Sequence, residues 1–176
     1  MLFTETRLKG AYTIDIEPHE DTRGFFARVW CKNEFAEQGL ASDLAQCSVA
    51  YNRRKGTLRG MHYLQAPHAE VKLIRCTKGA VYDVIIDLRP DSDTCRQWLG
   101  LELTEENHRT IYIPEGFAHG YMTLTDDTEL FYQMSQIYVP EADTGVRWND
   151  PAFGIEWPNV AEMIIAERDQ TWPLVD

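Results

Sequence analysis

The residues with the clearest potential for proton transfer lie in one short stretch, 57–63, which reads Thr-Leu-Arg-Gly-Met-His-Tyr. The imidazole of His62 can serve as a general base or acid. Arg59 and the nearby Lys72 are cations that can bind an anion. In a regular strand Arg59 and His62 point to opposite faces, so a bulge or kink at Gly60 is needed to bring both to one cavity. Without it, the pattern equally fits a core histidine beside a surface arginine.

A second motif contains another histidine. Residues 114–120 read Pro-Glu-Gly-Phe-Ala-His-Gly, and this PxGxxH pattern resembles the second metal-binding motif of the cupins, barrels whose inward-facing histidines often hold a metal. The first cupin motif needs His-x-His, but the second residue after His62 is Leu64. His62 and His119 alone are a poor ligand set for a transition metal. We therefore expect a cupin-like barrel that uses no metal and no cofactor.

The segments that must position these residues are predicted to be mainly strands and turns. One short helix is expected at 33–38, capped by Asn33 and ended by Gly39 in the left-handed conformation. Apolar alternation predicts strands at 71–75, 80–88, 98–103, 110–113, 120–124 and 129–138, with turns at 78–79 and 126–127. Many short strands without long helices favour an all-β, double-stranded β-helix (jelly-roll) barrel with a few short helices.

Length and charge limit the classes of function. The 176 residues predict a single domain over 1–176, and 17 Lys and Arg against 28 Asp and Glu give a net charge of -11. Such a chain is a poor binder of polyanions, so no nucleic-acid partner is expected. No apolar run reaches about 20 residues and no signal-like start is present, which predicts no membrane partner and a cytoplasmic location. The absence of GxGxxG and GxxxxGK[ST] disfavours dinucleotide-dependent oxidoreductases and P-loop nucleotidases.

Seven blocks spread over nearly the whole chain resemble, in order and spacing, the dTDP-4-dehydrorhamnose 3,5-epimerase family. The blocks are residues 21–26, 58–63, 72–75, 84–89, 116–120, 148–151 and 155–158. The resemblance implies an isomerase of deoxysugar biosynthesis that epimerises a nucleotide-diphosphate 4-keto-6-deoxyhexose at C3, C5 or both. The ketone acidifies the adjacent C–H bonds, so such an enzyme needs a base on one face, a donor to the enolate oxygen and an acid on the other face.

The same resemblance implies roles for individual residues. His62 matches the base, Asp169 the carboxylate that orients it, Lys72 the enolate donor and Tyr132 the proton donor on the opposite face. The implied substrate-binding residues are Arg23, Phe26, Arg59, His119, Tyr138, Asp143 and Arg168, with Arg23 and Arg59 on the diphosphate and Phe26 and Tyr138 on the nucleobase. In this family Arg23 and Phe26 arrive on an N-terminal strand exchanged between subunits, which implies a homodimer.

Some positions depart from the family pattern. Arg28 stands where thymidine-using relatives have a Glu, Val49 where they have an Asn, and Asp143 where they usually have a Glu. Because Arg28 and Val49 fall on recognition positions, we expect a different nucleotide or a differently decorated sugar. The alternatives are a sugar-nucleotide 3,4-ketoisomerase, a metal-dependent cupin enzyme using His62 and His119, and a non-catalytic sugar-nucleotide-binding cupin.

Overall fold

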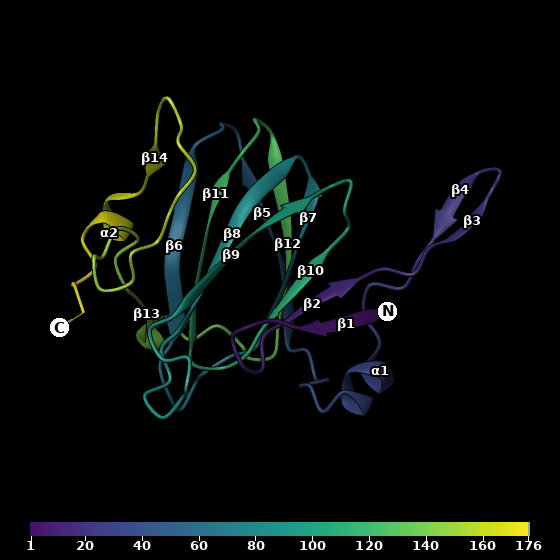
Figure 1. Ribbon diagram of the computed structural model, residues 1–176, viewed down its shortest axis with the longest axis horizontal. Coiled ribbons are helices and arrows are strands. Elements are labelled where there is room, and N and C mark those ends of the chain that lie inside the picture. Colours follow the sequence, from purple (N-terminus) through teal and green to yellow (C-terminus); the bar gives the residue numbers. More distant parts are fainter. Residues whose placement is uncertain (176) are drawn as a thin grey trace.

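Two β-sheets face each other across a shared core in the computed structural model, which describes residues 1–175 (Figure 1). The first sheet has the order β1 (Leu2–Glu5), β2 (Tyr12–Asp15), β10 (Thr110–Ile113), β7 (Lys72–Lys78), β12 (Thr128–Met134) and β5 (Gln46–Asn52). The second has the order β13 (Asp143–Gly145), β6 (Thr57–Leu64), β11 (Phe117–Thr123), β8 (Ala80–Asp87) and β9 (Trp98–Thr104), with β14 (Ile164–Ile165) beside β6. The prediction of an all-β jelly-roll barrel is confirmed.

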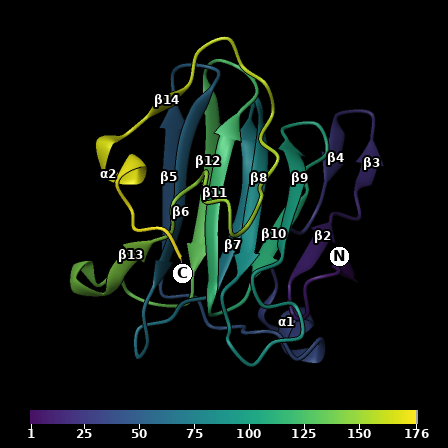
Figure 2. The ribbon, with the colours of Figure 1, turned by 60° about the vertical axis from the view of Figure 1, so that its left-hand side comes forward.

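The remaining elements lie outside the barrel wall. Strands β3 (His19–Asp21) and β4 (Gly24–Phe26) form a hairpin that projects away from the two sheets (Figures 1 and 2). Helix α1 (Lys32–Glu37) follows it, and the 3-10 helix η1 (Pro140–Ala142) and helix α2 (Glu167–Gln170) lie near the C-terminal half of β6 and β13. None of the helices within residues 1–175 is long and apolar enough to span a membrane.

The main hydrophobic core fills the space between the sheets. Ile74 and Leu130 of the first sheet pack with Val81, Ile85 and Tyr121 of the second, and all five side chains are almost fully buried. Burying an aliphatic side chain of this size stabilises the fold by roughly 1.5–3 kcal/mol. This dry core fixes the spacing of the strands on which the functional residues lie.

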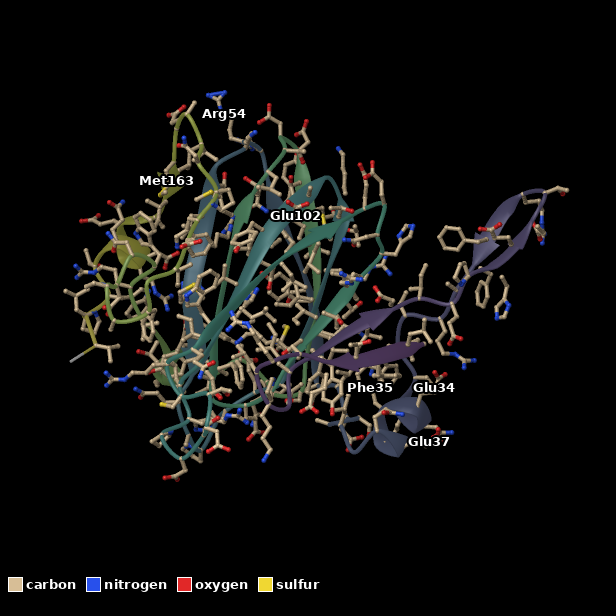
Figure 3. The ribbon with its side chains drawn as sticks, viewed as in Figure 1. Glu34, Phe35, Glu37, Arg54, Glu102 and Met163 are labelled. Carbon is tan, nitrogen blue, oxygen red and sulfur yellow. The ribbon has the colours of Figure 1, made fainter. Side chains whose placement is uncertain are left out.

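Helix α1 packs on the outside of the first sheet through one aromatic residue. The ring of Phe35 is fully buried and meets Phe3 edge-on, with ring centroids 5.2 Å apart. On the same helix Glu34 pairs with Arg28 at 2.7 Å, and Figure 3 labels Glu34 and Phe35. Arg28, which departs from the family pattern, therefore has a carboxylate partner within its own chain.

The start of this helix differs from the prediction. Helix α1 begins at Lys32, and its N-cap is Cys31 rather than Asn33, so the predicted capping role of Asn33 was wrong. The physical reason is that the backbone N–H of Phe35 bonds the carbonyl of Cys31, which closes the first turn before Asn33 can cap it. Gly39 has a φ of 71°, as expected for the residue that ends the helix.

Several strand boundaries also differ. The strand at 110–113 is β10 residue for residue, but β12 ends at Met134 instead of residue 138. It ends there because its neighbours β5 and β7 both run out at that level, where Met134 pairs with Gln46 and Lys72. Strand β11 begins at Phe117, three residues before the prediction. The PxGxxH motif therefore delivers its histidine from within a strand.

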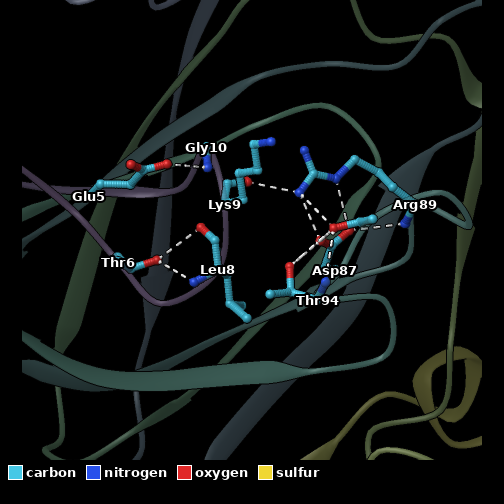
Figure 4. Close-up of polar contacts among 9 residues, drawn as sticks. Glu5, Thr6, Leu8, Lys9, Gly10, Asp87, Arg89 and Thr94 are labelled. Carbon is cyan, nitrogen blue, oxygen red and sulfur yellow. Dashed lines mark hydrogen bonds and ion pairs between the residues drawn. The ribbon is translucent and has the colours of Figure 1, made fainter.

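A buried carboxylate ties the N-terminal loop to the end of β8. Asp87 accepts hydrogen bonds from Arg89 Nε (2.9 Å), Ser92 Oγ (2.6 Å) and Thr94 Oγ1 (2.7 Å), and Arg89 also donates to the carbonyl of Lys9 at 2.8 Å (Figure 4). Burial alone raises the pKa of Asp87, but these donors outweigh it and hold the pKa at about 2.

We expect Asp87→Asn to destabilise the fold at pH 7 by roughly 3 kcal/mol, because Arg89 loses its buried partner. The folded-state pKa lies below the ordinary value of about 3.9, so the stabilisation is complete above that pH and is lost as pH falls toward 2. Urea unfolding at pH 7 and at pH 2.5 measures both effects. Asp91→Asn, in the exposed turn that follows β8, is the matched control and leaves the midpoint nearly unchanged. Equal midpoints for Asp87→Asn and the parent at pH 7 contradict the assignment.

Candidate active site

A cavity of about 490 Å³ opens between the two sheets. Strands β5, β7 and β12 supply its wall on one side, and β6 and β11 supply the other. Its lining includes most of the cations, imidazoles and phenols that the sequence singled out: Arg59, His62, Lys72, His119, Tyr132, Tyr138 and Asp143, together with Glu70, Tyr121 and Val49. A ligand in this cavity is flanked by His62 of β6 on one side and by Tyr132 of β12 on the other.

The kink expected at Gly60 is present. Gly60 has a φ of 131°, and the pairing of β6 with β11 shifts register between His119 and Tyr121. A Cβ on Gly60 would lie 2.5 Å from the Cα of Gly120, so the two backbones touch where only glycine fits. As a result Arg59 and His62 line the same cavity, which regular strand alternation would prevent.

His62 is held by the predicted carboxylate. Its Nε2 donates to Asp169 Oδ1 at 2.6 Å, and Asp169 Oδ2 accepts the backbone N–H of Gly60 at 3.1 Å. Burial raises the pKa of Asp169, but the His62 ring and the Gly60 N–H outweigh it, so the pKa is lower than usual and the carboxylate stays ionised. With Nε2 committed to Asp169, the lone pair on Nδ1 is the basic site of His62.

Trp172 packs against His62 near the C-terminal end of the chain. Its ring lies edge-on to His62, with centroids 6.4 Å apart, and the guanidinium of Arg168 stacks over it at 4.8 Å. Gly145 makes room for the indole, because a Cβ there would lie 2.6 Å from it. Arg168 also donates to Asp143 at 2.7 Å, and Asp143 accepts the hydroxyl of Tyr138 at 2.8 Å. These contacts connect three predicted substrate-binding residues.

A second imidazole–carboxylate pair lies beside the first. His119 pairs directly across the strands with His62, and its Nε2 donates to the buried Asp83 at 2.8 Å. Burial raises the pKa of Asp83, and the His119 ring opposes that effect. The sequence analysis missed Asp83, although a signal was available: it lies between Val81 and Ile85 on a face that is otherwise apolar.

Lys72 and Tyr132 come from adjacent strands of the other sheet. The Lys72 ammonium pairs with Glu70 at 2.7 Å, and both side chains are largely buried. Burial raises the pKa of Tyr132 well above 10, so its phenol keeps its proton at neutral pH. The ring of Tyr132 lies edge-on to His119, with centroids 5.9 Å apart. The cavity thus combines a base, an ammonium and a protonated phenol, which is the set that enolisation and reprotonation require.

A model of the dTDP-4-dehydrorhamnose 3,5-epimerase family matches residues 5–176 of the sequence. The chain belongs to this family. The dTDP-4-dehydrorhamnose 3,5-epimerase of Methanothermobacter thermautotrophicus is 41% identical over 172 residues, which cover 97% of this chain and 92% of that protein.

Two solved structures are similar over nearly the whole chain. The dTDP-4-dehydrorhamnose 3,5-epimerase of Bacillus anthracis, with TDP and PPi bound, is 38% identical with a TM-score of 0.94 and covers 99% of both chains. A 3'-monoepimerase from Streptomyces bikiniensis, in complex with dTDP-quinovose, is 30% identical with a TM-score of 0.89, covering 96% of this chain and 85% of that one. The similar proteins therefore include an enzyme named for epimerisation at two carbon centres and an enzyme named for epimerisation at one.

Membership of the dTDP-4-dehydrorhamnose 3,5-epimerase family confirms the predicted family and the predicted class, a carbohydrate epimerase. The roles of individual residues stay predictions. Asp169 and Arg168 do not line the cavity themselves. Asp169 is hydrogen-bonded to His62, and Arg168 to Asp143, and both of these partners line it. Glu70 and Tyr121 line the cavity and Asp83 supports it, and no motif in the sequence analysis pointed to them.

Two predicted epimerase residues lie away from the cavity of their own chain. Arg23 and Phe26 are on the projecting β3–β4 hairpin, where their exposed fractions are 88% for the Arg23 side chain and 77% for Phe26. Arg23 pairs only with Asp21 at 2.5 Å among the contacts within residues 1–175. Both side chains are thus exposed, and neither lines the cavity of its own chain.

The donor set does not resemble a metal centre. Within residues 1–175 no group of three or more His, Cys, Asp and Glu side chains is arranged to hold a metal ion. The Nε2 atoms of His62 and His119 are hydrogen-bonded to two different carboxylates, Asp169 and Asp83. The two imidazoles therefore belong to two separate pairs.

Proposed function

We propose that this epimerase inverts C3, C5 or both of a nucleotide-diphosphate-linked 4-keto-6-deoxyhexose by proton abstraction and return, without a cofactor. The observation that carries the proposal is the opposition of His62, backed by Asp169 at 2.6 Å, and the protonated phenol of Tyr132 across one cavity. Lys72 lies in the same cavity, where an ammonium can stabilise a developing enolate.

The reaction follows from these three groups. Nδ1 of His62 removes the proton from the carbon next to the ketone, and the electron pair moves into the carbonyl to give an enolate oxygen. The ammonium of Lys72, kept in place by Glu70, donates a hydrogen bond to that oxygen. Tyr132 then gives its phenolic proton to the opposite face of the carbon, which inverts the centre. Reprotonation by His62 instead returns the original configuration.

The nucleotide half of the substrate is assigned to the outer part of the cavity. Arg59 lines the cavity and is the residue proposed to bind the diphosphate, since a planar guanidinium matches phosphate oxygens. Tyr138, held by Asp143 and Arg168, supplies an aromatic face for the nucleobase. We propose a homodimer in which the projecting hairpin delivers Arg23 and Phe26 to the partner's cavity. The exposure of both side chains supports this arrangement.

The base of the nucleotide is the least constrained part of the proposal. Val49 lines the cavity and offers no hydrogen bond where thymidine-using relatives have an amide. Arg28 is already paired with Glu34 on helix α1, and this pairing argues against a contact between Arg28 and the base. The cavity therefore supports a nucleotide sugar held mainly by its diphosphate and by stacking.

A panel of 4-keto-6-deoxyhexoses linked to dTDP, UDP, GDP and CDP, followed by proton NMR in deuterium oxide, tests the function. We expect deuterium at C3, at C5 or at both, with formation of the inverted sugar, for at least one nucleotide. Incorporation without inversion means that a proton is removed but returned to the same face, and migration of the ketone to C3 indicates a 3,4-ketoisomerase. No exchange with any member of the panel refutes the proposed epimerase activity.

A further inference from the structure

Asn52 is buried behind the cavity and was not among the residues that the sequence singled out. It is the last residue of β5, and only 2% of it is exposed. Its Nδ2 group donates to the carbonyl of Thr128 at 3.3 Å, on the neighbouring strand β12. The amide nitrogen therefore faces a backbone acceptor, which leaves the oxygen Oδ1 to face the active site.

That oxygen accepts two hydrogen bonds from residues that line the cavity. Arg59 donates through Nε at 2.9 Å, and Tyr121 donates through its hydroxyl at 3.2 Å. The Arg59 guanidinium is thereby anchored at Nε, and Nη2 also donates to the carbonyl of Tyr51 at 3.5 Å, so Nη1 is left to meet the substrate. The second bond matters because Tyr121 is almost fully buried, and a buried hydroxyl without a partner is costly.

Tyr121 connects Asn52 with the proposed proton donor, Tyr132. Tyr121 and Tyr132 both line the cavity, and the ring of His119 lies against both, with centroids 6.2 Å from Tyr121 and 5.9 Å from Tyr132. Because Tyr121 gives its own proton to Asn52, any hydrogen bond between the two phenols has to be donated by Tyr132. One amide oxygen thus connects the cation proposed for the diphosphate with the acid proposed for the sugar.

We propose that Asn52 is a positioning residue of this active site, which holds Arg59 toward the diphosphate and, through Tyr121, holds Tyr132 in place for proton transfer. The inference rests on the proposed function, since it gives Arg59 and Tyr132 the roles assigned there. Asn52 itself does not line the cavity and touches no substrate.

The first test is the affinity for dTDP, measured by calorimetry on the full chain without turnover. Asn52→Leu, close in shape but without polar atoms, is expected to weaken binding about tenfold. Asn52→Asp keeps an oxygen for Arg59 and Tyr121 and is expected to recover most of that loss. If Asn52→Leu does not fold, Asn52→Ala replaces it with the same expected result. Wild-type affinity in the folded Leu or Ala variant overturns the proposal.

A double-mutant cycle distinguishes positioning from a general structural effect. In an Arg59→Leu background, Asn52→Leu is expected to weaken dTDP binding by less than twofold, because the residue through which it acts is gone. Losses that multiply in the double variant overturn the proposal. Tyr121→Phe tests the second contact of Asn52, the one toward Tyr132. For this variant we expect dTDP affinity within twofold of wild type but a kcat reduced about fivefold. Unchanged kcat overturns the link to Tyr132.

A third measurement does not depend on the proposed function. In the free protein, the Nε–H of Arg59 should exchange slowly with solvent by nitrogen-15 NMR, and Asn52→Leu should make this exchange at least tenfold faster. Unchanged exchange overturns the positioning of Arg59 by Asn52. If wild-type protein fails to bind dTDP while this exchange responds as expected, the failure lies in the nucleotide assigned to the site and the positioning stands.

Discussion

Replacing His62 with alanine is expected to lower the kcat of epimerisation by about a thousandfold. Its Nδ1 is the basic atom on its side of the cavity, and the bond from Nε2 to the ionised Asp169 stabilises the imidazolium formed when a proton is taken up. Without the ring, the carbon acid has no base at hydrogen-bond distance. Both deuterium incorporation and inversion should therefore be lost together.

The measurement is single-turnover proton NMR in deuterium oxide with the best substrate of the panel. His68→Ala is the matched control, because His68 lies in the loop after β6, outside the cavity lining, and its loss should change kcat less than twofold. The dTDP affinity of His62→Ala should stay within about threefold of wild type, which shows that the site is intact. Exchange at the wild-type rate in His62→Ala rules out His62 as the base.

The sequence predicted the barrel well where apolar alternation is strong. Strand β10 was predicted residue for residue, and β8 within one residue at its end, because each carries inward apolar residues bounded by a turn. Strand β12 was predicted too long, since its end depends on where β5 and β7 stop pairing with it. That information lies in other parts of the chain, and local alternation does not contain it.

The site was predictable to the extent that its residues lie in motifs. Resemblance to the family located His62, Tyr132 and Asp169, although 107 residues separate the histidine from its carboxylate. The residues that support them were not found. Asp83 is a single carboxylate on an apolar strand face, which signals a buried charge but not its partner, and no motif marks Asn52 at the end of β5. Their positions are meaningful only once two sheets face each other.

Tyr132→Phe is expected to separate exchange from inversion. His62 remains, so it can still remove a proton, exchange it with solvent and return deuterium to the same face. The phenol that supplies the opposite face is missing, and we expect formation of the inverted sugar to fall about a hundredfold while deuterium incorporation falls less than fivefold. The two rates are measured in the same NMR experiment.

Tyr112→Phe is the matched control for loss of a buried phenol hydroxyl. The Tyr112 hydroxyl accepts the backbone N–H of Ala41 at 3.1 Å, away from the cavity, so its removal should cost about 1 kcal/mol of stability and leave both rates within twofold. If Tyr132→Phe lost exchange and inversion to the same degree, the phenol would be acting in enolate formation itself. Since Tyr132 and His62 come from opposite sheets, inversion at normal rates without the phenol would mean that water, rather than β12, delivers the second proton.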